Sequence, residues 1–325
     1  MKYLAALLLL ASAVPGQERQ VLSLLDRIEL PNVNGRIDHF AADLNGRRLF
    51  VAALANHTVE VIDVESGKRL QTISDLAEPQ GVYFEVSAKR LFVASARDGT
   101  VKVFDAGSFQ LLETVKLSAD ADNIRYDARS RRVVVGYGSG SGALAFLDAG
   151  GKQTGEIALD GHPESFQIER NGTRVFVNVP DQKEIQVVDL GNNTQLAKWP
   201  VTSAQKNYPM SLDETHHRLF IGCRAPARML VIDTGSGKQT AAIEIVGDSD
   251  DLFYDTMRNR VYVIGGQGYV DVFEPRDEAH LQRVAHLPTA AGARTGLFVP
   301  EWSKLFVAVP RRGVERAGIL VFEAR

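Results

Sequence analysis

The stretch Arg48-Leu49-Phe50-Val51 decides the fold, because versions of it return six more times along the 325-residue chain. Each copy is a basic residue followed by three apolar residues, and the later copies begin at Arg90, Arg132, Arg174, Arg218, Arg260 and Lys304. The step is 42 residues from Arg48 to Arg90 and 44 from Arg260 to Lys304. A fixed period of about 40 to 50 residues built from strands is typical of the blades of a β-propeller.

Turn residues divide each repeat into short strands. An acid lies five residues before the basic residue in six of the seven repeats, as Asp43 does before Arg48. A further alternating segment, such as residues 59–63, ends in Asp before a Gly-containing turn. Asp bonds the backbone of a turn and Gly accepts positive φ, so both suit hairpins. The repeat therefore predicts an all-β chain, a seven-bladed β-propeller of four-stranded antiparallel blades.

The two ends of the chain are predicted to complete one blade between them. The last repeat ends with its third strand, Ile319-Leu320-Val321-Phe322, and lacks an outer strand. Residues 20–30 (QVLSLLDRIEL) precede the first repeat and match outer strands such as 68–73. We therefore expect a single propeller over 20–325, with blade seven formed by about 293–325 plus 20–30, so that the N-terminal strand closes the ring.

The repeat resembles those of the YVTN-repeat propellers, which include the YncE-like exported proteins. The matching residues are Arg-Leu-Phe-Val-Ala at 48–52, Thr-Val-x-Val-Phe/Ile-Asp at 58–63 and 100–105, and Ser-Gly-Lys at 66–68. The resemblance covers about residues 20 to 325 and implies the propeller fold, whereas a fold of this kind does not fix a function. The family's Tyr-Val-x-Asn core is replaced in the first three repeats, and Asn178 is the nearest approach to its Asn.

The first thirteen residues (1–13) have the pattern of a signal peptide. Lys2 precedes an apolar run over 3–10, and Ala11-Ser12-Ala13 resembles a cleavage site. The run is shorter than the roughly 20 residues that span a bilayer, and no later stretch is long and apolar enough. We expect a periplasmic or secreted protein with no transmembrane segment after cleavage at Ala13. The alternative is an uncleaved N-terminal anchor.

Composition excludes some classes of function. The formal net charge is −3 and 24% of the residues are charged, which predicts no basic face for nucleic acid. Cys223 is the only cysteine, so no intramolecular disulfide forms, and its position at a strand end indicates a small buried hydrophobic residue. We expect a monomer that binds no nucleic acid.

Polar residues that differ from repeat to repeat mark a candidate site. The inner strand of each blade is predicted to begin about ten residues before the basic residue, at positions such as Asp38 and Asp250. Inner strands line the tunnel of a propeller, so these positions surround one mouth. We predict that this mouth binds a small anionic or polar ligand, or a protein partner, through Arg36, Asp38, His39, Asp122, Asn123, His162, Glu164, Lys206, Tyr208, Asp250, Asp251, Arg294 and Thr295. The alternative is a wet tunnel mouth whose charges are balanced by their neighbours.

No cofactor is expected, although a divalent cation stays open as an alternative. Carboxylates are the oxygen ligands that Ca²⁺ or Mg²⁺ takes, and such an ion would use Asp38, Asp122, Glu164 and Asp250. Alternation along a strand predicts that Asp250 and Asp251 point to opposite sides, which limits the set.

Catalysis and simple binding compete as uses of the mouth. In an enzyme such as a lactone hydrolase or lyase, His162 or Glu164 would act as general base, and Arg294 with Arg36 would stabilise an oxyanion. In a binding module, the loop 311–316 adds further cations to the same face, and guanidinium groups suit carboxylate or phosphate ligands.

Overall fold

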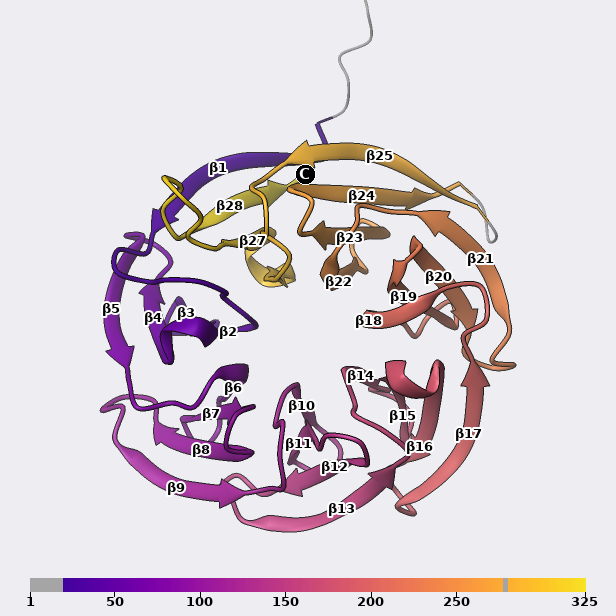
Figure 1. Cartoon of the computed structure of the whole chain (residues 1–325), viewed down its shortest axis with the longest axis horizontal. Helices are drawn as coiled ribbons and strands as arrows, with labels where there is room; N and C mark the ends of the chain where they lie inside the picture. Colours follow the sequence, from indigo (N-terminus) through magenta and orange to yellow (C-terminus); the bar gives the residue numbers. More distant parts are fainter. Residues whose placement is uncertain (1–19, 277–279) are drawn as a thin grey trace, which may run out of the picture.

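Seven four-stranded sheets stand in a ring in the computed structural model, which describes residues 20–276 and 280–325 (Figure 1). All pairings within the sheets are antiparallel, and the strands of the first six blades follow one another in chain order from the tunnel to the rim. The prediction of an all-β, seven-bladed propeller is confirmed.

Each of the first four blades is one continuous segment of the chain. Blade one consists of β2 (Phe40–Asp43), β3 (Arg48–Ala53), β4 (Thr58–Asp63) and β5 (Lys68–Ile73). Blade two consists of β6 (Pro79–Glu85), β7 (Arg90–Ser95), β8 (Thr100–Asp105) and β9 (Leu111–Lys116). Blade three consists of β10 (Ile124–Asp127), β11 (Arg132–Tyr137), β12 (Gly142–Leu147) and β13 (Gln153–Leu159). Blade four consists of β14 (Ser165–Ile168), β15 (Arg174–Val179), β16 (Glu184–Asp189) and β17 (Thr194–Pro200).

The last three blades follow the same order until the ring closes. Blade five consists of β18 (Gln205–Asp213), β19 (Arg218–Ala225), β20 (Ala227–Asp233) and β21 (Gln239–Glu244). Blade six consists of β22 (Ser249–Asp255), β23 (Arg260–Gly265), β24 (Tyr269–Pro275) and β25 (Leu281–Pro288). Blade seven consists of β26 (Gly296–Val299), β27 (Lys304–Val309), β28 (Gly318–Ala324) and β1 (Leu22–Glu29). Three short 3-10 turns lie at η1 (Leu54–Asn56), η2 (Pro180–Gln182) and η3 (Pro300–Trp302).

The N-terminal strand closes the ring, as predicted. Strand β1 pairs antiparallel with β28, from Leu22 opposite Ala324 to Glu29 opposite Gly318, and the two lie together at the top of Figure 1. The backbone N–H of Arg325 donates to the carbonyl of Val21 at 3.1 Å. Blade seven is therefore made from both ends of the described chain.

The hydrophobic core lies between blades rather than within one of them. Phe50 of blade one packs against Phe84 of blade two, with ring centroids 5.6 Å apart, in a cluster that also holds Val61 and Leu91. Among the described residues, a buried cluster of this kind lies at each of the seven junctions between neighbouring blades. Each sheet thus buries both faces, which explains the apolar runs after each basic residue.

The basic residue and the turn acid of the repeat form a structural pair. Arg48 Nη2 lies 2.8 Å from Asp43 Oδ2, and Nη1 donates to the carbonyl of Ala106 in blade two at 2.9 Å. Arg174 of blade four likewise donates to the carbonyl of Thr234 in blade five at 2.6 Å. In these two blades the arginine therefore fixes its own turn and also links its blade to the next.

Arg260 also links neighbouring blades, at the closure of the ring, although its acid partner is Glu274 rather than the turn acid Asp255. Its side chain is buried, Nε donates to Glu274 Oε1 at 2.6 Å, and Nη1 donates to the carbonyls of Val21, at 3.1 Å, and Arg325. Removing one partner of a buried charged network costs about 3 to 5 kcal/mol. We expect Arg260→Met to lower the free energy of unfolding by about 3 kcal/mol in urea denaturation.

The equivalent change in blade two is the control for Arg260. Arg90 pairs with Asp105 at 2.9 Å, but both side chains are about a third exposed, so Arg90→Met is expected to cost no more than about 1 kcal/mol. Equal losses in the two variants would contradict a special role of Arg260 in closing the ring.

The predicted signal peptide, residues 1–13, lies outside the described residues. Within the described chain, no helix has the length and apolar character needed to cross a membrane.

Candidate functional site

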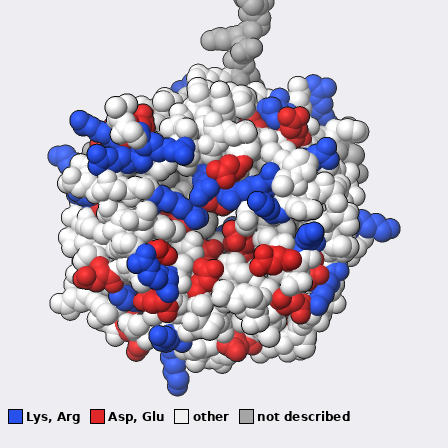
Figure 2. Space-filling model, viewed as in Figure 1, with Lys and Arg blue, Asp and Glu red and all other residues white. Residues whose placement is uncertain are grey.

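A cavity of about 550 Å³ occupies the tunnel, and the inner strands of the blades form its wall. At one end it is lined by charged residues that precede or begin the inner strands, among them Arg36, Glu164 and Asp250. At the other end it is lined by residues from the turns that follow those strands, such as Leu44 and Pro300. We call the charged end the polar mouth and define it by Arg36, Asp122, His162, Glu164, Tyr208, Arg224, Asp250 and Arg294. Charged side chains of both signs surround the central opening in Figure 2.

Three arginines from different blades converge on Asp250 at the polar mouth. Arg294 Nε lies 3.1 Å and Arg36 Nη2 3.4 Å from Asp250 Oδ2, while Arg224 Nη2 pairs with Oδ1. Asp250 is buried and the arginines are only partly exposed. The carboxylate therefore holds together side chains from blades one, five, six and seven.

A second carboxylate, that of Asp38, lies next to Arg36. Asp38 is fully buried and lies 2.8 Å from Arg36 Nη2. Burial raises the pKa of Asp38 to about 6, although Arg36 and His39 oppose the shift. Burial also disfavours the charged form of Arg36, but Asp38 and Asp250 outweigh it and hold its pKa above the usual value. Arg36 is a permanent cation whose charge these two acids already balance.

A bulge in β22 brings Asp250 and Asp251 to the same cavity. The pairing register of β22 with β23 shifts between Ser249 and Asp251, and both aspartates line the tunnel. The expected alternation of the two side chains does not hold in its simple form here, because the extra residue of a bulge interrupts the period of the strand. Asp251 Oδ2 accepts from the backbone N–H of Gly296 at 2.8 Å and so joins blade six to blade seven.

The opposite side of the polar mouth holds Asp122, His162 and Glu164, from blade three and the start of blade four. His162 Nε2 lies 3.9 Å from Asp122 Oδ2 and 3.7 Å from Glu164 Oε2. Burial and the nearby Asp122 raise the pKa of Glu164 to about 8. Burial works against the cation of His162, but Asp122 and Asp120 prevail and raise its pKa to about 9.

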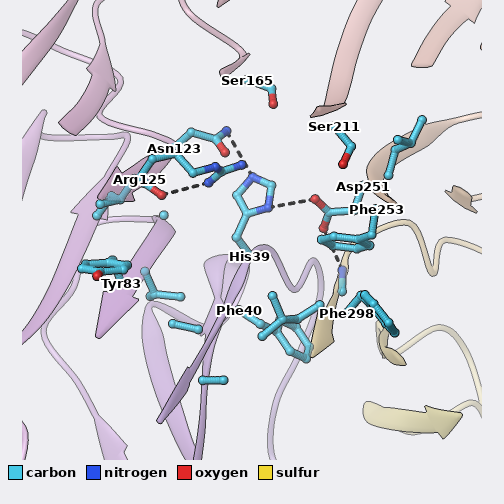
Figure 3. A pocket seen from close by; sticks show the side chains of 18 of the residues that line it. His39, Phe40, Tyr83, Asn123, Arg125, Ser165, Ser211, Asp251, Phe253 and Phe298 are labelled. Atoms are coloured by element: carbon cyan, nitrogen blue, oxygen red, sulfur yellow. Dashed lines mark hydrogen bonds and ion pairs between the residues drawn. The ribbon is translucent and has the colours of Figure 1, made fainter. Parts of the chain in front are cut away.

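His39 stands at the centre of the tunnel, between Asn123 and Asp251 (Figure 3). Its Nδ1 lies 3.5 Å from Asp251 Oδ1, and its Nε2 lies 3.4 Å from Asn123 Nδ2. Burial alone would lower the pKa of His39, but Asp251 and Asp38 raise it to about 10. At neutral pH the middle of the tunnel therefore carries an imidazolium cation.

His39, Asn123 and Asp251 belong to a first ring of residues, one from the start of each inner strand. A second ring of tunnel residues lies two positions further along each of these strands. Side chains two apart share one face of a strand, so the ring that begins with His39 and Asn123 continues with the next inward position of each blade. All seven of these positions line the cavity, and they are Ala41, Tyr83, Arg125, Gln167, Ser211, Phe253 and Leu297. The sequence prediction stopped at the first ring and missed this one, although the period of two would have found it.

Arg125 is the charged member of this second ring. Its Nη1 donates to the carbonyl of Ile124 at 2.8 Å, and its guanidinium lies 5.7 Å from the centre of the Phe166 ring. Burial lowers its pKa below the usual value, although Asp251 and Asp122 oppose the shift from beyond ion-pair distance. Figure 3 shows Arg125, Asn123 and His39 pointing into the same space.

Two residues predicted for the mouth lie elsewhere. Lys206 is exposed and does not line the tunnel cavity. Thr295 is buried, and its hydroxyl donates to the carbonyl of Ile37 at 2.9 Å, which ties blade seven to the start of blade one. Tyr208 is at the mouth as predicted, and the Arg224 guanidinium lies 4.1 Å from the centre of its ring. The cation that blade five contributes to the polar mouth is therefore Arg224, not Lys206.

The carboxylates expected to hold a metal do not gather as one set. Asp38 and Asp250 pair with arginines. In the described residues, the group whose ligand atoms all lie within 4.8 Å of one another consists of Asp122, His162 and Glu164.

Comparison with known proteins finds similarity in structure alone. No protein-family model and no curated protein sequence matches the chain. A chain of the mitotic checkpoint complex superposes with a TM-score of 0.77 at 13% identity, covering 99% of this chain and 98% of that one. Hydrazine synthase of Kuenenia stuttgartiensis superposes with a TM-score of 0.72 at 14% identity, covering 94% of this chain and 100% of that one. The chain is thus a seven-bladed β-propeller, and identities this low carry the comparison no further than the fold.

Proposed function

We propose that the chain is an exported propeller of the YVTN-repeat, YncE-like kind whose tunnel binds a small organic anion. The observation that carries the proposal is Arg125, a half-buried guanidinium in the tunnel that Asp251 and Asp122 influence only at longer range than an ion pair. A partly buried guanidinium without a directly bound carboxylate can still form charge-assisted hydrogen bonds, and an anion in the cavity would accept them. Export rests on residues 1–13 alone.

The residues around Arg125 indicate what kind of anion would fit the cavity. The imidazolium of His39 adds a second positive charge in the same tunnel, and Ser165 and Ser211 also line the cavity. Tyr83, Phe253 and Leu297 supply apolar surface in the ring of Arg125. Pockets of this kind bind through apolar contact and a few polar groups that fix orientation. The proposed ligand is therefore a carboxylate with an apolar or aromatic body.

The geometry favours binding over lactone hydrolysis or lyase chemistry. An oxyanion needs donors that are free to meet a developing negative charge. Arg36 and Arg294 are both paired with Asp250, and Arg294 also lies 3.1 Å from Asp248. The two arginines first considered for that role therefore already serve carboxylates of the protein.

Benzoate, succinate and inorganic phosphate are the probes that test this proposal, with uncharged benzamide as the matched neutral compound. A ligand that binds only the folded state raises the melting temperature. We expect benzoate to raise it and benzamide not to. Charge-assisted hydrogen bonds contribute about 1.5 to 3 kcal/mol, so Arg125→Gln should weaken benzoate binding at least about tenfold in calorimetry.

Arg129→Gln is the matched control, because Arg129 is an exposed arginine of the same blade. It should bind benzoate as the wild type does. The proposal fails if none of the three anions binds, if benzamide binds as well as benzoate, or if Arg125→Gln leaves benzoate affinity unchanged.

A further inference from the structure

We propose that Asp122, His162 and Glu164 bind one divalent transition-metal ion, such as Zn²⁺ or Mn²⁺, at the polar mouth. This site is separate from Arg125 and does not depend on the proposed binding of an organic anion. One imidazole nitrogen and two carboxylate oxygens form the donor set, and their ligand atoms all lie within 4.8 Å of one another.

The imidazole of His162 is oriented for a metal by its other nitrogen. His162 Nδ1 lies 2.6 Å from the carbonyl oxygen of Gly138. A carbonyl only accepts, so Nδ1 carries a proton, and Nε2, which faces Asp122 and Glu164, is the nitrogen that would give up its proton to bind a metal. Histidines that bind metals typically donate their second N–H to a carbonyl or carboxylate in this way.

The loop that supplies this carbonyl has a backbone conformation that requires glycine. Gly138 has φ of 106°, and a Cβ there would lie 2.5 Å from the carbonyl oxygen of Ser141. Only glycine fits this backbone without strain. The glycine-rich segment 136–142 thus places the carbonyl that fixes the tautomer of His162.

The distances between the three side chains also suit an ion between them. Nε2 lies 3.9 Å from Asp122 Oδ2 and 3.7 Å from Glu164 Oε2, which is too long for hydrogen bonds. Ligands held about 2.1 Å from one ion lie about 3.4 to 3.6 Å apart in tetrahedral or trigonal geometry. The imidazole would need to approach each carboxylate by only a few tenths of an ångström, and the ligand atoms of the two carboxylates already lie within 4.8 Å of each other.

Asp122 provides a second, independent observation, which is a buried carboxylate oxygen without a hydrogen-bond donor. Its side chain is 9% exposed, and its Oδ1 is buried without a hydrogen-bond partner. The nearest cationic group to that oxygen is His39 Nε2, at 3.9 Å. A buried carboxylate oxygen without a donor is unfavourable, and a cation bound to the same carboxylate through Oδ2, the oxygen nearer His162, would compensate for part of that cost.

The donor set favours a transition metal over the Ca²⁺ or Mg²⁺ first considered. Ca²⁺ takes six to eight oxygen ligands and Mg²⁺ prefers oxygen and water, whereas an imidazole suits Zn²⁺ and its neighbours in the first row. Three protein ligands leave a position open, as catalytic and substrate-binding metal sites do. Asp122 and Glu164 both line the tunnel cavity, so that position faces it.

Calorimetric titration of the metal-stripped protein with ZnCl₂, and separately with MnCl₂, tests the site in a buffer free of carboxylates. We expect one ion per chain for at least one of the two metals. His162→Ala and Glu164→Gln should each weaken that binding at least about tenfold. Loss of a residue that only supports a metal ligand already weakens binding about 10- to 100-fold, and these two residues would be ligands themselves. The melting temperature of the metal-free variants shows that they are folded, and only the wild type should gain stability from the metal.

The double variant His216→Gln/His217→Gln is the matched control, because these histidines form an exposed pair on a turn of blade five. It should bind the metal as the wild type does. The proposal is overturned if neither metal binds, if binding survives both His162→Ala and Glu164→Gln, or if the surface double variant abolishes it. A His162→Ala variant that loses the metal but still binds benzoate would separate the two sites.

Discussion

A chain that lacks residues 20–30 is expected not to fold into a stable ring. The deletion removes β1 and leaves β28 as an open edge. It also removes four buried apolar side chains, Val21, Leu22, Ile28 and Leu30. Each contributes about 1.5 to 3 kcal/mol, and their sum matches the whole net stability of a typical domain, about 5 to 15 kcal/mol. Circular dichroism at 37 °C should show loss of the cooperative thermal transition.

The two ends of β1 explain why the loss spreads beyond one blade. Val21 and Leu22 belong to the cluster between blades six and seven, while Ile28 and Leu30 belong to the cluster between blades seven and one. A chain that begins at Gln20 is the control and should melt as the full chain does. A peptide of residues 20–30 added to the truncated chain should restore part of the transition by strand addition. An unchanged melting temperature in the truncated chain would refute closure by β1.

Asp250→Asn is expected to destabilise the folded protein by about 3 kcal/mol. The change removes the negative charge on which Arg36, Arg224 and Arg294 converge. It leaves three guanidinium groups in one place, and their mutual repulsion is screened only in part because Asp250 is buried. Thermal melting should show a fall of about 6 °C or more.

Asp181→Asn is the matched control for Asp250. Asp181 is exposed in the turn η2 of blade four, and surface substitutions of this kind are usually within about 0.5 kcal/mol of neutral. If Asp250→Asn melts within about 1 °C of Asp181→Asn, the arginines do not depend on this carboxylate, and the polar mouth is held together by other contacts.

The fold was predictable because its signal is repeated. Seven copies of a basic residue before an apolar strand give the number of blades, and the missing outer strand of the last repeat identifies residues 20–30 as its replacement. The turn acid and the basic residue were placed correctly as a structural feature. The sequence does not show that Arg48 also reaches the carbonyl of Ala106 in the next blade, because that contact depends on how neighbouring blades are packed.

The candidate site was predictable only in part. Counting positions from the basic residue predicted the ring of His39, Asn123 and Asp251, which lines the tunnel together with the charged residues of the mouth. It missed Arg125, which the period of the strand would have revealed. It could not show the bulge at Asp250, because one extra residue in a strand changes the direction of the side chains without changing the pattern of residue types.

The meeting of the two chain ends determines where anything attached to this molecule must emerge. Val21 and Arg325 are joined by a backbone hydrogen bond in blade seven, and the C-terminus lies at the periphery of the ring (Figure 1). A tether or fused partner at either end would leave from one shared point, far from the axis. An attachment at that point would not lie over either mouth of the tunnel.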